Sequence, residues 1–433
     1  MSVAPRVVEK KDDSAVMVAG RIAGAALTSH PSHRDHPIHP ETRVYHPNEP
    51  EQSRFRKIYA VNTGSYSTSG NRKFTIEVPT EGIMQKKTCR LVIPSTLAIS
   101  ANQAAWARGE AGSCLQRLKV SIGKNTASDI DYYGVLAVKK RKFDYANQNT
   151  LSKSAVIGYY AAQTDVAAAE QDFIIEFVPG HILNQSIPLF LLDNGSKLKI
   201  EFEIGSDTNV YTATNTGSNA RTLTIASPYL IYREINDEAS KATYNQGMGI
   251  QFLDFTGEKK AVAATTNSFT LDHRHHAGRL MGAEVYSMHD ADEVSHTEHN
   301  KLWYDNPNDL TEVKVEYQNR QIVIDSNIEK PKGSEGWLLN ELWSESAGDS
   351  KTAYSPSVSS WGGVDGDWRL CIPLSSLPHR KGHAGYKQDR TLTLTLSYSS
   401  TSEALNLYPF YVTSKTIHFG ADGRFKIDEL VLV

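Results

Sequence analysis

The sequence lacks the features by which most enzymes and membrane proteins are recognised. Its 433 residues contain no apolar run of the roughly 18 residues that a membrane-spanning helix requires. The GxGxxG, P-loop, GxSxG and HExxH motifs, which mark phosphate, nucleotide, nucleophile and zinc chemistry, do not occur either. We therefore predict a protein that is not an enzyme and has no catalytic, cofactor-binding or metal-ligating residues.

An excess of charge of one sign is missing, and cysteine is scarce. Lysine and arginine (46) nearly balance aspartate and glutamate (49), so the formal net charge is -3. No overall positive field exists to hold nucleic acid by its phosphates, and we expect no sequence-specific nucleic-acid partner. The cysteines are odd in number, widely spaced and set in or beside apolar runs: Cys89, Cys114 and Cys371. This pattern favours buried free thiols and a reducing compartment over a disulfide framework.

Residues 1–53 contain little that could be buried. The only apolar stretch, Val16–Leu27, is interrupted by Arg21 and preceded by two aspartates, which does not fit a secretory signal. Prolines and histidines follow in alternation: Pro31, Pro37, Pro40, Pro47, Pro50, and His30, His33, His36, His39, His46. The prolines prevent a helix that would bring these histidines together on a metal. We predict an extended N-terminal arm that orders against partner subunits.

Alternation of apolar and polar residues is abundant in the rest of the chain. In Lys197–Ile204 (KLKIEFEI), Leu198, Ile200, Phe202 and Ile204 alternate with charged residues. This is the pattern of a strand with one buried and one solvated face, as in an antiparallel sandwich. Further strands are predicted at Lys73–Val78, Cys89–Ile93, Leu115–Ile122, Asp172–Val178, Arg221–Ile225, Tyr229–Ile235, Ile250–Phe255, Lys259–Ala263, Ser268–Asp272, Leu280–Met288, Leu310–Tyr317, Gln321–Ile324, Trp368–Ile372, Thr391–Tyr398, Phe410–Phe419 and Phe425–Val433.

A few short helices are predicted between the strands. Ser128 is a candidate N-cap followed by aspartates, and the helix after it would end in the basic run Lys139–Lys142. This run resembles a nuclear-import tetrad, but we predict a solvated last turn of helix. Asp237–Met248 is expected to be a short connecting helix or linker. Another helix is predicted at Gly336–Ser344, with Trp337, Leu338, Leu342 and Trp343 on its packed side.

Two blocks of the sequence repeat the same order of features. Ile187-Pro-Leu followed by Lys197–Ile204 is echoed by Ile372-Pro-Leu followed by Thr391–Tyr398 (TLTLTLSY). Each block continues into a polar loop and a tyrosine-bearing strand interrupted by proline. The fold class is therefore all-β, two consecutive eight-stranded jelly-roll sandwiches with short helices in loops. The predicted divisions are an arm at 1–53, a first jelly roll at 54–240 and a second at 241–433.

The duplication makes a specific prediction about packing. Leu198, Ile200, Phe202 and Ile204 should occupy the same core positions in the first sandwich that Leu392, Leu394 and Leu396 occupy in the second. If the two strands had different places in their sandwiches, the duplication would lose its main support.

Leu115–Arg141 and Phe177–Ile235 resemble the double jelly-roll major capsid proteins of tailless icosahedral DNA viruses. That lineage includes adenovirus, membrane-containing phages and virophages. The resemblance implies a homotrimer of pseudo-hexagonal outline that assembles an icosahedral shell. It further implies penton and minor capsid proteins as partners, an internal membrane as a candidate partner, and a place in the virion. Synthesis would be cytoplasmic, with nuclear assembly as an option.

Two other functions stay open at the level of sequence. The first is a two-domain carbohydrate-binding sandwich whose loop tryptophans stack on sugars. Burial is favoured for the candidates, which are Trp303, Trp337, Trp343, Trp361 and Trp368. The second is a glycan-active enzyme, for which the sequence offers no carboxylate pair. Asp290 with Asp292, and Asp365 with Asp367, are read as turns because no calcium-loop glutamate follows.

Two histidine-rich segments superficially resemble metal sites. The residues are His273, His275 and His276, and His289, His296 and His299 with Asp290, Asp292, Glu293 and Glu298. Their spacing matches no zinc motif, so solvated loops between strands are expected. If these histidines have a function, we expect their protonation to make the contact between subunits depend on pH.

Overall fold

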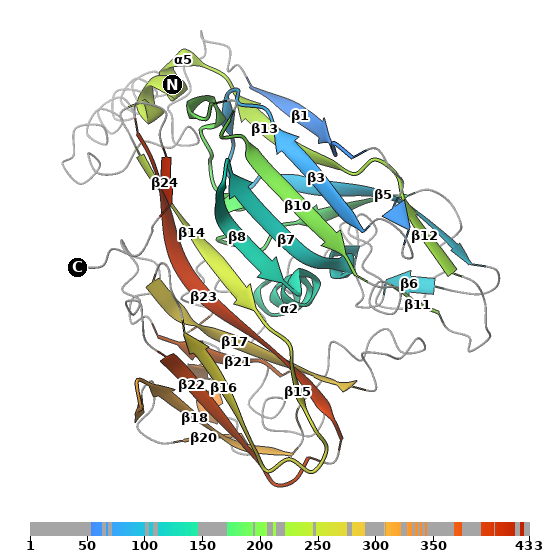
Figure 1. The fold of residues 1–433 in the computed structure, drawn as a ribbon, viewed down its shortest axis with the longest axis vertical. Coiled ribbons are helices and arrows are strands. Elements are labelled where there is room, and N and C mark those ends of the chain that lie inside the picture. The colour runs from blue at the N-terminus through green and yellow to red at the C-terminus, as the bar shows by residue number, and fades with distance from the viewer. Residues whose placement is uncertain are drawn as a thin grey trace, which may run out of the picture.

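The structure is a computed structural model, and part of the chain is described. The described residues are 53–62, 66–67, 72–99, 104–106, 111–145, 171–193, 195–205, 211–213, 221–245, 248–274, 279–290, 307, 309–321, 327–330, 334–336, 338–339, 343, 368–374, 391–401, 403–420 and 425–427. Within these residues the chain forms two antiparallel β-sandwiches, one after the other (Figure 1). None of the helices in the described part is long and apolar enough to cross a membrane.

The first sandwich consists of two facing sheets. Sheet 1A contains β1 (Ser53–Tyr59), β2 (Tyr66–Ser67), β4 (Ile83–Met84), β5 (Arg90–Ile99), β9 (Gln171–Glu176), β12 (Arg221–Ile225) and β13 (Tyr229–Ile235). Sheet 1B contains β3 (Lys73–Val78), β7 (Leu115–Ile122), β8 (Asn125–Asp131) and β10 (Leu198–Ile204). A small ribbon pairs β6 (Ala104–Trp106) with β11 (Tyr211–Ala213). The helical segments are η3 (Ala111–Cys114), α2 (Tyr133–Tyr145), η5 (Ile182–Asn184) and η6 (Leu189–Leu191).

The second sandwich has the same two-layer plan. Sheet 2A contains β14 (Met248–Gly257), β15 (Lys260–Val262), β17 (Arg279–His289), β21 (Leu370–Pro373), β23 (Leu405–Phe419) and β24 (Phe425–Ile427). Sheet 2B contains β16 (Ser268–Arg274), β18 (Leu310–Tyr317), β19 (Arg320–Gln321), β20 (Ile328–Glu329) and β22 (Thr391–Tyr398). Helix α5 (Glu238–Tyr244) connects the sandwiches, and its N-cap Asp237 accepts a hydrogen bond from the Ser240 backbone N at 2.8 Å.

The eight principal strands of each sandwich follow one jelly-roll order. In sheet 1A the adjacent strands are β1, β13, β5 and β9, which are the first, eighth, third and sixth in the chain. In sheet 1B they are β3, β10, β7 and β8, the second, seventh, fourth and fifth. Sheets 2A (β14, β23, β17, β21) and 2B (β16, β22, β18, β19) repeat both orders. The predicted all-β fold of two eight-stranded jelly rolls is therefore confirmed.

The predicted equivalence of the two alternating strands is also confirmed. β10 lies between β3 and β7, and β22 lies between β16 and β18, which are the corresponding neighbours. The burial of both strands alternates along their whole length. The inward-facing side chains are at most 2% exposed: Leu198, Ile200, Phe202, Ile204, Leu392, Leu394 and Leu396.

Two details of the predicted repeat are different in the structure. Ile187 bridges Met84 after the sixth strand, whereas Ile372 lies inside the sixth strand β21 and pairs with Ala283. The two Ile-Pro-Leu motifs are therefore not equivalent. β13, which directly follows Pro228, and β23, which contains Pro409, do correspond, because each is the last of the eight principal strands of its sandwich.

Several predicted secondary-structure elements need correction. Ser128 lies inside β8 and pairs with Val120 instead of capping a helix, because pairing along β7 outweighs the local capping pattern. The helix begins five residues later, at Tyr133. In the helical residues after β20, Leu338 is 49% exposed, so its predicted packed position is wrong, while Trp343 is buried as predicted. Trp337 and Leu342 lie outside the described residues. Of the predicted arm, only Ser53, the first residue of β1, is described.

Candidate assembly surfaces

An aromatic surface lies at the β1 edge of sheet 1A. Phe55 and Tyr59 are 69% and 52% exposed. Tyr59 pairs with Tyr229 on β13, and their ring centroids are 5.5 Å apart. The Lys57 Nζ lies 3.7 Å from the Tyr229 centroid and 5.0 Å from the Tyr59 centroid. We call Phe55, Lys57, Tyr59 and Tyr229 the β1 patch. Exposed aromatics clustered in this way are typical of protein–protein contact surfaces.

A buried carboxylate holds β1 in place beneath this patch. Glu234 on β13 accepts from Arg54 Nε at 2.8 Å and from Arg56 Nε at 2.7 Å, and Arg56 also contacts Glu81. Burial would raise the pKa of Glu234, but the hydrogen bonds from both arginines outweigh it and hold that pKa below its usual value. Gly82 has φ 62°, and a Cβ there would lie 2.6 Å from the Glu234 Cγ. Glu234 therefore ties β1 to β13 through two arginines.

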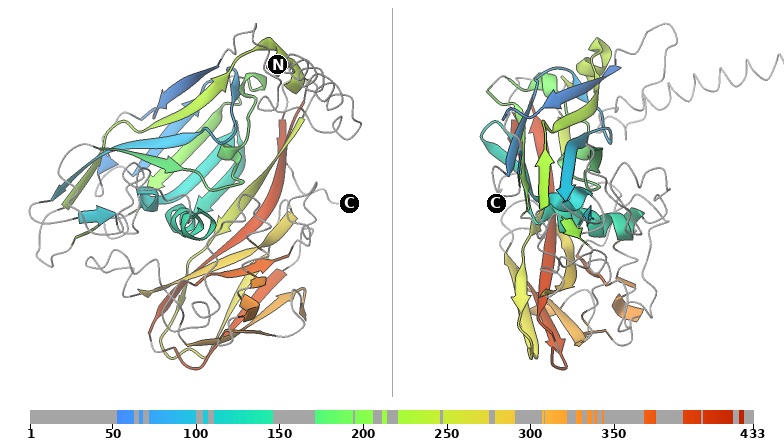
Figure 2. Two further views of the ribbon diagram at one scale, coloured as in Figure 1. Left: turned by 180° about the vertical axis from the view of Figure 1, so that it is seen from behind. Right: turned by 90° about the vertical axis from the view of Figure 1, so that its right-hand side faces the viewer.

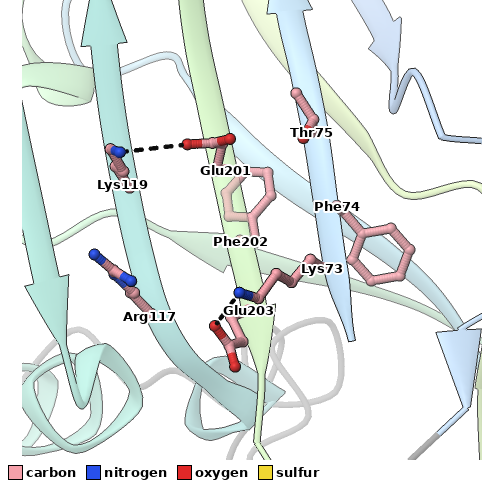
Figure 3. A pocket seen from close by; sticks show the side chains of 8 residues that line it. All are labelled: Lys73, Phe74, Thr75, Arg117, Lys119, Glu201, Phe202 and Glu203. Atoms are coloured by element: carbon pink, nitrogen blue, oxygen red, sulfur yellow. Dashed lines mark ion pairs between the residues drawn. The ribbon is translucent and has the colours of Figure 1, made fainter. Parts of the chain in front are cut away.

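The outer face of sheet 1B carries charge of both signs. A shallow cavity of about 300 Å³ lies there, and its lining includes three cations, Lys73, Arg117 and Lys119, and two carboxylates, Glu201 and Glu203 (Figure 3). Lys73 Nζ is 3.5 Å from Glu203, Lys119 Nζ is 3.8 Å from Glu201, and Arg117 pairs with Asp129 at 2.5 Å. Each carboxylate faces a cation, so the surface offers mixed-charge complementarity to a partner and not a pair of carboxylates poised for acid–base chemistry.

A buried ion pair links the two sandwiches. Lys140 on α2 is 3% exposed, and its Nζ donates to Glu284 Oε1 on β17 at 2.6 Å. The same carboxylate accepts from Tyr286 OH at 2.5 Å and Trp343 Nε1 at 2.6 Å. The Lys140 Nζ also lies 5.4 Å from the Phe255 ring centroid. The cost of burying this carboxylate is offset by three donors from both sandwiches.

The environment of Lys140 contradicts part of the sequence analysis. The sequence pattern predicts a solvated last turn of helix at Lys139–Lys142, but Lys140 is buried against the second sandwich. Its burial follows from a partner 144 residues away in sequence, which local pattern does not reveal.

A second polar chain crosses between the sandwiches. Ser128 Oγ donates to Asp254 Oδ1 at 2.6 Å, and Lys415 Nζ donates to Asp254 Oδ2 at 2.5 Å. His181 Nδ1 accepts from the Leu183 backbone N, which leaves Nε2–H to donate to Ser128 Oγ at 3.2 Å. Burial lowers the pKa of His181 to about 4, although Asp254 opposes the shift.

This second chain contains a serine, a histidine and an aspartate, but it is not arranged as a catalytic triad. The carboxylate of Asp254 contacts the serine and not the histidine, so it cannot orient the imidazole as a base. Ser128 and His181 are fully buried, and no substrate could reach them. The group instead ties β8 and the turn before η5 to β14 and β23.

The histidine segments differ from the expected solvated loops where they are described. His273 lies in β16, is 8% exposed and stacks on Tyr411 with centroids 3.7 Å apart. His289 ends β17, and its Nδ1 is 3.1 Å from Glu403 Oε2. The predicted loop placement is therefore wrong for His273 and His289, which both lie in strands. His275, His276, His296, His299, Asp292, Glu293, Glu298, Asp365, Asp367 and the five arm histidines lie outside the described residues.

The three cysteines follow expectation. Cys89, Cys114 and Cys371 are free and buried. Burial raises the pKa of the Cys114 thiol to about 12, and it shifts the pKa of Cys89 in the same direction. Within the described ranges, no three His, Cys, Asp or Glu side chains converge on a point where a metal ion could sit.

Comparison with solved structures identifies the fold. PBCV-1 VP54, from a crystal structure fitted into a reconstruction of the virophage Sputnik, superposes with a TM-score of 0.60 and 12% identity, covering 89% of this chain and 98% of that chain. The mavirus major capsid protein superposes with a TM-score of 0.53 and 10% sequence identity, covering 89% of this chain and 91% of that chain. The Faustovirus major capsid protein superposes with a TM-score of 0.55 and 9% sequence identity, covering 86% of this chain and 91% of that chain.

The similarity to these proteins lies in the structure. No protein-family model and no curated protein matches the sequence. The chain has the double jelly-roll fold found in viral major capsid proteins, as its strand order indicates independently.

Proposed function

We propose that this chain is a structural major capsid protein that trimerises into pseudo-hexameric capsomers and assembles an icosahedral viral shell. The observation that carries the proposal is a double jelly roll superposing on major capsid proteins over 86–89% of the chain. The β1 patch supplies an exposed aromatic surface suited to self-association. The paired charges of sheet 1B add a second candidate contact surface.

The domain division belongs to the same proposal. Residues 1–53 form an arm that orders against neighbouring subunits, residues 54–240 form the first jelly roll, and residues 241–433 form the second. The later boundary falls within α5, between the last strand of one sandwich and the first strand of the next. Penton and minor capsid proteins, and an internal membrane, are further candidate partners of the shell.

The proposal places the protein in the virion, after synthesis in the host cytoplasm and with nuclear assembly as an option. It assigns no enzymatic activity and no cofactor, because function resides in extended contact surfaces. The carbohydrate-binding alternative gains no support from the tryptophans whose side chains are described: Trp343 is 5% exposed and Trp368 is fully buried. Neither is available to stack on a sugar.

Assembly measurements test the proposal directly. Size-exclusion chromatography with light scattering on the purified full-length protein should give a stable trimer. Electron microscopy should show particles of hexagonal outline, or shells. Deletion of residues 1–50 should leave the trimer intact and impair shell formation. A persistent monomer that binds an oligosaccharide would contradict the capsid function and favour a lectin.

A further inference from the structure

The two sandwiches of one chain pack together in a defined way. β14, the first strand of the second sandwich, lies beside β8, the fifth strand of the first (Figure 1). A Cβ at Gly257 would lie 2.4 Å from the Asp131 carbonyl oxygen, which shows how closely the two strand ends approach. Phe252 and Phe255 on β14 are consequently buried, at 2% and 0% exposed.

The connection that follows β8 completes this contact. It contains Tyr132 and helix α2, and it lies between the fifth and sixth strands of the first sandwich. The Tyr132 ring packs edge-on against Tyr408 with centroids 5.5 Å apart, and Lys140 pairs with Glu284. Sheet 2A is thus covered on its outer side by the fifth strand and the following connection of the first sandwich (Figure 2).

Within the described part of the chain, the elements that correspond to β14 and α2 expose apolar side chains. Among the described residues, four large apolar side chains are exposed: Phe55, Tyr59, Val61 and Leu338. Phe55 and Tyr59 lie on β1, the first strand of the first sandwich, which corresponds to β14. Leu338 lies between β19 and β21, the fifth and sixth strands of the second sandwich, at the point in the strand order where α2 lies in the first.

We infer that the segment containing Leu338 in one copy packs on the β1 patch of a second copy, as α2 packs on sheet 2A within each chain. The inference rests on the proposed function and names the surfaces through which the chains associate. The contact is head-to-tail, because the surfaces differ and each copy presents both. Three copies would close a ring in which contacts within a chain alternate with contacts between chains.

The chemistry of the β1 patch fits such a partner. Aromatic side chains supply much of the energy of protein interfaces when they are desolvated at the centre of a contact, and leucine provides a complementary apolar surface. The Glu234 pairs with Arg54 and Arg56 fix β1 before association, so little ordering of the strand is needed on binding.

Charge substitution tests the inference in the full-length protein. Phe55→Asp/Tyr59→Asp and, separately, Leu338→Asp should each convert the trimer seen by light scattering into a monomer. Thr270→Asp, at an exposed position on β16, is the matched control and should remain a trimer. Circular dichroism and thermal unfolding should show that every variant is folded, since all these side chains are exposed.

Crosslinking supplies a second readout that does not depend on weakening the contact. The natural cysteines are buried, so introduced thiols should react selectively with a short bis-maleimide. The Phe55→Cys/Leu338→Cys double variant should yield covalent trimers on a denaturing gel, whereas each single variant should remain one chain. Covalent dimers of Phe55→Cys alone would indicate a symmetric contact and overturn the head-to-tail assignment.

The outcomes distinguish the inference from the proposed function. A wild-type trimer that survives both sets of aspartate substitutions, with no crosslinking of the double variant, would overturn the inference and leave the capsid function standing. A wild-type protein that stays monomeric at every concentration would contradict the proposed function, and the inference with it.

Discussion

The two sandwiches share one strand order and differ in what covers them. The first strand of the second sandwich, β14, lies beside β8 of the first sandwich in the same chain and buries Phe252 and Phe255. Its counterpart β1 exposes Phe55 and Tyr59 to solvent. Sheets 1B and 2B also differ, because the outer face of β10 carries one lysine and two glutamates, whereas that of β22 carries threonines and a serine. The core strands of the two sandwiches therefore occupy equivalent positions, and the sandwiches differ in the residues on their outer faces.

The largest expected effect comes from breaking the buried contact that joins the sandwiches. Lys140→Met leaves Glu284 buried without its cation, so the free energy of unfolding should fall by ~3–5 kcal/mol. Urea unfolding monitored by tryptophan fluorescence measures the loss. The double variant Lys140→Met/Glu284→Gln should recover much of it, since the amide oxygen can accept from Trp343 Nε1 and the amide NH2 can donate to the Tyr286 hydroxyl oxygen. An unchanged urea midpoint of unfolding for Lys140→Met would show that the contact between the two sandwiches does not depend on the Lys140–Glu284 pair.

Matched core truncations test whether the two cores are energetically alike. Ile200→Ala in β10 and Leu394→Ala in β22 remove fully buried side chains at equivalent positions. Each should lower the free energy of unfolding by ~2–5 kcal/mol, the usual range for such cavities. Chemical denaturation with two spectroscopic probes would reveal whether one sandwich unfolds before the other. A negligible cost at either position would contradict equal burial in the two cores.

Acidification should weaken the contact between the two sandwiches through protonation of His181. Its pKa is 6.5 when unfolded and about 4 when folded, so the unfolded state binds the proton more readily between these values. Stability is full above pH 6.5 and should decrease as the pH falls to 4, by at most ~3 kcal/mol. Thermal unfolding of the wild type and His181→Gln across this range measures the difference. Parallel pH profiles for the two proteins would exclude a contribution from His181.

The smallest effect is expected on the charged face of sheet 1B. Glu201→Gln removes pairs with Lys119 and Lys199, all partly exposed, and should cost only ~0–1 kcal/mol at low salt. Because salt screens such pairs, the difference from wild type should shrink as the ionic strength rises. Thr395→Val on the outer face of β22 serves as the salt-insensitive counterpart. A large salt-independent cost for Glu201→Gln would assign that residue a role beyond surface pairing.

Strands with a clear alternating pattern could be predicted to the residue. β7, β18 and β22 have the predicted bounds, because one face of each is buried and the two-residue period is visible in the sequence. β8 was missed because its sequence, NTASDID, has little alternation and contains a local capping pattern. Its strand conformation depends on pairing with β7, which is a tertiary property.

The candidate contact surfaces are harder to predict from the sequence than the fold is. Phe55 and Tyr59 lie in an alternating run whose apolar face could equally have been buried. Leu338 and Leu339 are neighbours, yet one is 49% exposed and the other is 2% exposed. Which of two adjacent apolar residues faces solvent depends on the packing of other segments. Sequence alone predicted only that such surfaces should exist on a self-associating protein.

The sequence by itself determined the strands with clear alternation and the equivalence of β10 and β22, since a strand's own residues record which face is buried. Only the tertiary structure decided how the sandwiches meet, because that contact joins residues such as Ser128 with Asp254 and Lys140 with Glu284, which are 126 and 144 positions apart. A buried charge is stable only beside its partner, and neither residue carries a local signal of the other.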